Sequence, residues 1–194
     1  MNRAAGPRSE QGQTLPLYIV AVAALLLLAV AFFAVGQASA VRGDAQTAAD
    51  AAALAAARSE RDGVQDALLK ALTSGNLAQL GTLLQPGAND CAAAGQYAAD
   101  NRASVTRCDP ANGEPGYTVK VISLDTVGGS PVQGTQSMHA TATATAVIEP
   151  RCTVQGKNGN SIRLTCDGND ISIDPTAAGF HLDLADFFTV HLST

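Results

Sequence analysis

The chain has 194 residues, a formal net charge of −5, and 46% hydrophobic but only 4% aromatic residues. The acidic balance, with no basic run beyond residue 41, argues against nucleic acid as a partner. Alanine supplies much of the hydrophobic content and tryptophan is absent, so we expect a modest core.

The first predicted element is an uncharged apolar run over residues 15–35. A helix of this length spans roughly 31 Å, about the thickness of the hydrocarbon core of a bilayer. Lipid offers the backbone no hydrogen-bond partner, so such a run must be helical. We therefore predict a transmembrane helix at 15–35, preceded by a cytoplasmic tag at 1–14 whose Arg3 and Arg8 favour an N-terminus inside the cell.

A cleaved secretory signal peptide is the alternative interpretation of this region. Arg3 and Arg8 would supply its basic start, and Ala38-Ser39-Ala40 has the small-x-small pattern of a cleavage site. The apolar core of a signal peptide is about 7–15 residues long, which is shorter than this run. Length therefore favours a retained anchor, whereas cleavage after Ala40 would release a ligand-binding module. Both interpretations export the rest of the chain.

Residues 36–75 are predicted to form a helical stalk, with one helix at 41–58 and a second at 62–72. The first is rich in alanine, the best helix former. Two interpretations of its small-residue face are open. The face reflects helix propensity and compositional bias alone, or it packs closely against a helix of a partner or of a second copy. The second interpretation names Ala49, Ala52 and Ala56 as packing residues, with Asp50 on the polar side fixing the register.

The remaining residues, 76–194, are expected to form an exported α+β domain. A short helical piece at 77–84 ends at Pro86-Gly87, an Ala-rich segment of helix or loop follows between residues 91 and 108, and 109–116 is rich in turn residues. From residue 117 the period changes to two, which predicts antiparallel strands. We place them at 117–124, 138–148 and 180–192, with a hairpin at 151–167 and a bulge at Asp186. In the strand at 138–148, alternate alanines make a flat face suited to packing against a helix or a second sheet, and the threonines face water.

All four cysteines, Cys91, Cys108, Cys152 and Cys166, follow the apolar run, and none forms a Cys-x-x-Cys pair. An even number in an exported domain predicts two disulfides rather than a zinc or redox site. Placing Cys152 opposite Cys166 also puts Val154 opposite Leu164 and Gly156 opposite Ile162 on one face, which favours a cross-strand bridge. Cys91 and Cys108 flank one local unit and form the second predicted pair.

The sequence offers no candidate catalytic, cofactor or metal site, so we expect a protein that is not an enzyme. His139, His181 and His191 fall at outward positions of their predicted strands. No metalloprotease, nucleophile-elbow or phosphate-loop motif occurs. The acidic segment at 167–174 lacks the ligand spacing of a calcium loop, and we interpret it as a polar turn between two strands.

Two motifs flank the apolar run: Glu10-Gln11-Gly12-Gln13 before it, and Gln46-Thr47-Ala48-Ala49-Asp50-Ala51-Ala52-Ala53-Leu54-Ala55-Ala56-Ala57 after it. Together they resemble the N-terminal segment of the TadE/TadG-like proteins of Tad-type (Flp) pilus-assembly systems. Leu17 stands at the fifth position after Gly12, where processed prepilin-like relatives carry Glu, so the resemblance implies the uncut, TadG-like form.

The resemblance implies a bacterial envelope protein that assists assembly of a pilus or secretion system. Its expected partners are the membrane and proteins of that apparatus, with self-association as a further option. The complete prediction is a single-pass membrane protein whose disulfide-stapled α+β domain lies outside the cytoplasm.

Overall fold

The computed structural model describes residues 14–84, 91–128, 134 and 136–193. The arginines of the expected N-terminal tag, the motif at 10–13 and the predicted helix stop at Pro86-Gly87 lie outside these residues. The fold is α+β, as predicted, with one long N-terminal helix, three shorter α-helices and two antiparallel sheets among the described residues.

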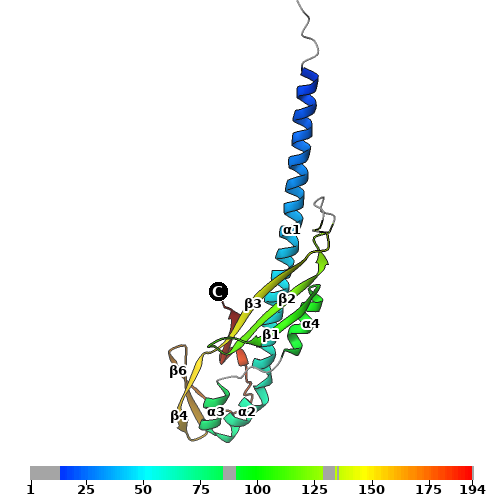
Figure 1. Ribbon diagram of the computed structural model, residues 1–194. Coiled ribbons are helices and arrows are strands. Elements are labelled where there is room, and N and C mark those ends of the chain that lie inside the picture. The colour runs from blue at the N-terminus through cyan, green and yellow to red at the C-terminus, as the bar shows by residue number, and fades with distance from the viewer. Residues whose placement is uncertain (1–13, 85–90, 129–133, 135, 194) are drawn as a thin grey trace, which may run out of the picture.

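One helix, α1 (Thr14–Gly63), runs from the apolar segment into the domain (Figure 1). Nearly all of its residues between 15 and 35 are exposed. Within the described part of the chain, it is the one helix long and apolar enough to cross a membrane. Gly36 and Gly43 do not interrupt it. The predicted helices at 15–35 and 41–58 are therefore two parts of one continuous rod.

Two short helices turn the chain back at the far end of α1. The chain bends at Gly63 and Val64, so α2 (Gln65–Ser74) begins three residues later than predicted. Gly75, with a φ of 66°, ends α2 in the left-handed conformation that glycine tolerates best. The Asn76 side chain then accepts a hydrogen bond from the Gln79 N–H at 3.1 Å and begins α3 (Leu77–Leu83).

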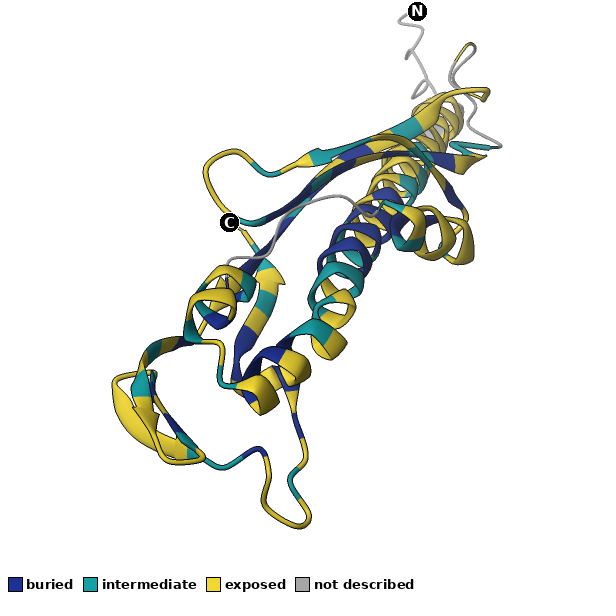
Figure 2. Ribbon diagram, turned by 90° about the horizontal axis from the view of Figure 1, so that it is seen from below, coloured by how far each residue is buried: buried dark blue, intermediate teal, exposed yellow. Residues whose placement is uncertain are grey.

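The larger sheet has the strand order β1-β2-β3-β7 and packs one face against α1. Its strands are β1 (Ala103–Pro110), β2 (Gly116–Thr126), β3 (His139–Pro150) and β7 (Phe188–Leu192). Helix α4 (Ala92–Asp100) packs against α1 and β1. Figure 2 shows the buried residues gathered on the domain half of α1 and on the strands that curve over it. We call the sheet face toward α1 the inner face and the opposite one the outer face.

The alternation predicted for β3 is confirmed. Ala142, Ala144 and Ala146 are buried on the inner face, whereas Thr141 and Thr143 are exposed on the outer one. Alanine side chains are short, so the helix axis can lie close to the sheet. The result is a core made largely of small residues, in which Tyr117 and Phe188 are the largest fully buried side chains.

The smaller sheet, order β4-β5-β6, lies at the end of the domain farthest from the apolar half of α1 (Figure 1). Its strands are β4 (Cys152–Asn158), β5 (Ser161–Cys166) and β6 (Asn169–Ile173). Cys152 pairs with Cys166 and Val154 with Leu164, as predicted. The predicted pairing of Gly156 with Ile162 is wrong, because a bulge after Val154 shifts the register and Gly156 faces Arg163. The hairpin loop is correspondingly shorter than the five residues expected.

The segments at 103–110 and 180–187 also differ from their predicted structure. The chain between residues 103 and 110 is a strand, β1, where a helix or loop and then a turn were expected. The predicted strand at 180–192 is a strand only from Phe188, because a 3₁₀ turn, η1 (Leu184–Asp186), precedes it. The Asp183 carboxylate accepts a hydrogen bond from the Ala185 N–H at 2.9 Å and stabilises this turn, so Asp186 lies in a turn and not in a bulge.

The predicted boundary at 75/76 does not separate a stalk from a domain. Residues of α1 from Ala45 to Ala57 belong to the same buried cluster as the strands. Leu68, Leu72 and Leu80, from α2 and α3, are also in this cluster. The helical part of the chain beyond Ala45 is thus the centre of the domain.

Candidate functional site

The Ala-rich face of α1 is used inside the domain. Ala49, Ala52 and Ala56 have no exposed surface and belong to the core cluster that α1 forms with β2, β3 and α4. This corrects the interpretation in which these residues pack against a helix of a partner or a second copy. The physical reason is that a small-residue face permits close approach of any backbone, and the nearest available one is the protein's own sheet.

Asp50, expected to fix register against a partner, acts at the rim of this same interface. Its Oδ1 accepts a hydrogen bond of 2.8 Å from Gln46 Nε2, one helical turn earlier. The same nitrogen lies 3.5 Å from the Thr143 carbonyl oxygen on β3. Gln46 and Asp50 therefore connect α1 to the sheet, and the alanines between them fill the interface.

A second polar contact lies at the domain end of α1. The buried Tyr117 hydroxyl on β2 donates a hydrogen bond of 3.1 Å to Glu60 Oε2. Together with the Gln46 contact, it ties the helix to the sheet at two levels, so the domain cannot turn about the axis of α1 without breaking both.

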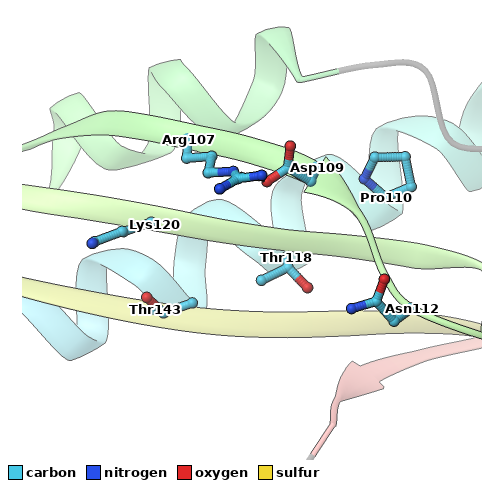
Figure 3. Close-up of a pocket in the computed structure, with 7 residues that line it drawn as sticks. All are labelled: Arg107, Asp109, Pro110, Asn112, Thr118, Lys120 and Thr143. Carbon is cyan, nitrogen blue, oxygen red and sulfur yellow. Dashed lines mark hydrogen bonds and ion pairs between the residues drawn. The ribbon is translucent and has the colours of Figure 1, made fainter.

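The outer face of the larger sheet is the main polar surface on these strands. Arg107, Lys120 and Thr143 form one row across β1, β2 and β3, and Asp109, Thr118 and Thr145 form the next row. The Thr118 and Thr145 hydroxyl oxygens are 2.9 Å apart. Figure 3 shows the Arg107 and Asp109 side chains turned toward one another, and they form an ion pair.

A shallow, open depression of about 400 Å³ lies on this outer face. Its lining residues are Arg107, Asp109, Pro110, Asn112, Thr118, Lys120 and Thr143. They offer hydrogen-bond donors and acceptors over a flat area, together with a threonine-rich surface. Such an arrangement suits contact with another macromolecule better than the enclosure of a small ligand.

The histidines and the acidic segment are dispersed. His139, His181 and His191 are all exposed, as predicted, and come from different segments. Among the described residues, no three His, Cys, Asp or Glu side chains gather as metal ligands would.

The polar turn predicted at 167–174 is a turn only at Asp167 and Gly168, because residues 169–173 pair with β5 as strand β6. Asp167 forms an ion pair with Arg151, which raises the pKa of that guanidinium. Asp170 accepts a hydrogen bond from the Thr165 hydroxyl at 2.6 Å. The hydroxyl and the N–H of Thr176 both donate to Asp174, and these bonds lower the pKa of its carboxyl.

Both predicted disulfides are present. Cys91–Cys108 joins the start of α4 to β1, and Cys152–Cys166 crosses between β4 and β5. The described residues include no free cysteine. The first bridge holds α4 against the strand that carries Arg107 and Asp109, and the second stabilises the smaller sheet.

The fold and these surfaces define a class: a helix able to span a membrane continues as the central helix of a disulfide-bridged α+β domain. Residues 12–59 match the Tad family model, described as Flp pilus-assembly TadE/G-like. The resemblance found in the N-terminal segment is thereby confirmed, and together with the apolar helix it supports a Tad-related membrane protein. Comparison of the chain with curated proteins and with solved structures gave no match.

Proposed function

We propose that this protein is a non-enzymatic, membrane-anchored envelope component that assists assembly of a Tad-type pilus or secretion system. Residues 15–35 of α1 hold it in the membrane as a single pass, with the N-terminus in the cytoplasm and the domain outside. Arg3 and Arg8 before the apolar run support this orientation, and so do the two disulfides, which persist in oxidising compartments.

The observation that carries the proposal is the position of the matching segment in the fold. Residues 12–59 cover the apolar half of α1 and almost all of the half that the sheet encloses. The motif from Gln46 to Ala57 supplies the buried alanines and the Gln46–Asp50 pair at the rim. The family sequence therefore coincides with the part of the chain that joins an anchor to an exported domain.

The continuous helix also supports a retained anchor over the release of a secreted module. Ala40 lies inside α1, and the buried face of the helix begins five residues later at Ala45. Cleavage after Ala40 would divide a regular helix close to the start of the domain core. The helix to the domain side of such a cut would have to form its first turn without the preceding residues.

The outer sheet face is the surface we assign to a protein of the assembly apparatus. It combines exposed threonines with Arg107, Asp109 and Lys120 on a sheet whose other face packs against α1 and α4. Its hydrogen-bonding groups stand on strands and are therefore rigidly placed, which lowers the entropic cost of binding.

A strain lacking the gene tests the proposal. We expect loss of surface filaments or of Tad-dependent secretion, with rescue by the wild-type gene. A photo-reactive amino acid at Thr118 or Thr143 should cross-link to a protein encoded with the Tad apparatus, whereas the same group at Arg163, on the smaller sheet, should not. Normal filaments and normal secretion in the deletion strain would refute the assembly role.

A further inference from the structure

The partly buried side of α1 continues from the domain core into the apolar run. The side of α1 that faces the sheet is buried at Ala45 and Ala48, and it remains half-buried at Val41, Gln37 and Ala34. These positions recur every three or four residues, which is the spacing of one helix face. Ala34 belongs to the apolar run, so this side of the helix continues to the level at which α1 is expected to enter the bilayer.

Among the described strands, the paired end of β2 and β3 lies nearest that level. Thr126 pairs with His139 there, and Figure 1 shows this end beside the middle of α1. From the Gln46 contact at Thr143 to His139, the strand advances four residues, roughly 13 Å toward the apolar run. A helix covers this distance in about nine residues, which reaches Gln37, two residues beyond the end of the apolar run at Val35.

Two large apolar side chains are exposed at this end of the β2–β3 hairpin. Leu124 on β2 is 56% exposed and Met138, just before β3, is 55% exposed. They are the most exposed large hydrophobic residues outside the apolar run among those described. The neighbouring charges are balanced, because Arg102 Nε lies 3.3 Å from Asp125 Oδ2 in an ion pair.

We propose that Leu124 and Met138 insert into the membrane surface, at the boundary between lipid headgroups and acyl chains. This inference rests on the proposed membrane anchor and adds a second point of contact beside it. Burial of two exposed apolar side chains is favourable, and the electrically balanced surroundings need no anionic lipid. With α1 and the hairpin end both held, the domain has a fixed tilt and a fixed rotation relative to the membrane.

The absence of tryptophan from the chain allows a direct test with single-tryptophan variants. Four full-length proteins are reconstituted: Leu124→Trp and Met138→Trp at the hairpin end, Phe32→Trp in the apolar run as positive control, and Ile171→Trp on β6 as negative control. Ile171 is itself an exposed apolar residue, at 38%, in the sheet farthest from the apolar half of α1. The vesicles are phosphatidylcholine, with or without brominated acyl chains that quench nearby tryptophan.

We expect Phe32→Trp, Leu124→Trp and Met138→Trp to be quenched by the brominated lipid and to emit at shorter wavelength than Ile171→Trp. Quenching at the hairpin end should exceed that at residue 171 at least about twofold, since insertion at the interface is only about 5–10 Å deep. If Phe32→Trp is quenched and both hairpin variants behave like Ile171→Trp, the inference is wrong and the anchor stands. If Phe32→Trp is not quenched, the anchor and the inference fall together.

Discussion

Gln46 Nε2 lies 2.8 Å from Asp50 Oδ1 and 3.5 Å from the carbonyl oxygen of Thr143, so one amide group joins two turns of α1 to the edge of β3. β7 pairs with β3 only from Ala146 onward, and the Thr143 carbonyl therefore lies beyond the end of that neighbouring strand. The motif that marks the family segment thus satisfies a backbone group that the short last strand leaves uncovered.

The first prediction concerns this contact. Gln46→Ala and Asp50→Ala should each lower the free energy of unfolding by about 0.5–1.5 kcal/mol, the usual net contribution of a hydrogen bond. A double-mutant cycle measured by denaturant unfolding should show that the two losses do not add, because they remove the same bond. Arg58→Ala, at an exposed position of α1, is the control for helix propensity. Strictly additive losses would show that the pair is not coupled.

The second prediction follows from the buried alanine face. Ala52→Leu should destabilise the domain by about 1–3 kcal/mol or more, because extra methyl groups must displace a close-packed sheet. Ala40→Leu, at an exposed position of the same helix, should change the stability little, since leucine is also a good helix former. Thermal unfolding of the two variants gives the comparison. Equal melting temperatures would mean that the sheet does not cover Ala52.

The third prediction uses two glycines with opposite roles. A Cβ on Gly116, whose φ is 153°, would lie 2.1 Å from the Ala146 carbonyl oxygen, so Gly116→Ala must move backbone and should cost more than about 2 kcal/mol. Gly95, within α4, has nothing within 4 Å of its would-be Cβ, and Gly95→Ala should stabilise by roughly 0.5–1 kcal/mol. Chemical denaturation measures the loss of stability expected for Gly116→Ala and the gain expected for Gly95→Ala. A tolerated alanine at 116 would contradict the close pairing of β2 with β3.

The fourth prediction concerns the disulfides. Replacing Cys91 and Cys108 by serine removes a bridge between cysteines 17 residues apart in the sequence. Replacing Cys152 and Cys166 removes one between cysteines 14 residues apart. The chain-entropy relation then gives a loss of roughly 3 kcal/mol for each bridge. Unfolding of the two double variants measures the losses, and non-reducing peptide mapping of the wild type checks the pairing. A peptide linking Cys108 to Cys152 would overturn it.

The fifth prediction is a pH effect on the turn after β6. The hydrogen bonds from Thr176 hold the pKa of the Asp174 carboxyl below its usual value in the folded protein. The lowered pKa favours the folded state above the ordinary Asp pKa, and this contribution is lost as the pH falls through the folded-state pKa. Carbon NMR titration should find the low pKa. Thr176→Val should raise it, and an unchanged pKa in that variant would contradict the assignment.

How much of this structure the sequence predicts depends on whether a signal is local. The uncharged run, the helical period at 41–58, the Ala/Thr alternation of β3 and the paired cysteines at 152 and 166 are local patterns, and the structure confirms the helix, strand or disulfide that each one predicts. The bulge after Val154 was not predicted, because the three pairs aligned from the sequence also fit a regular ladder with a longer loop.

The other errors come from tertiary contacts. β1 contains Arg107, Asp109 and Pro110, which read as turn or surface residues, and it is a strand because it pairs along the edge of β2. Residues at 180–187 do alternate between exposed and more buried positions, but the Asp183 side chain caps a 3₁₀ turn there and the segment is not a strand. The alanine face indicates close packing without specifying its partner, and the topology supplies β2, β3 and α4 from the same chain.

The apolar helix, which is long enough to cross a membrane, and the core helix of the domain form one continuous element. Peptide-resolved hydrogen exchange of the full-length protein in lipid nanodiscs tests it at residues 36–44, between the apolar run and the first buried alanine. A continuous α1 predicts that these amides exchange slowly, with protection that continues without a break into residues 45–57. Exchange of 36–44 at the rate of an unstructured linker, with protection on both sides, would contradict it.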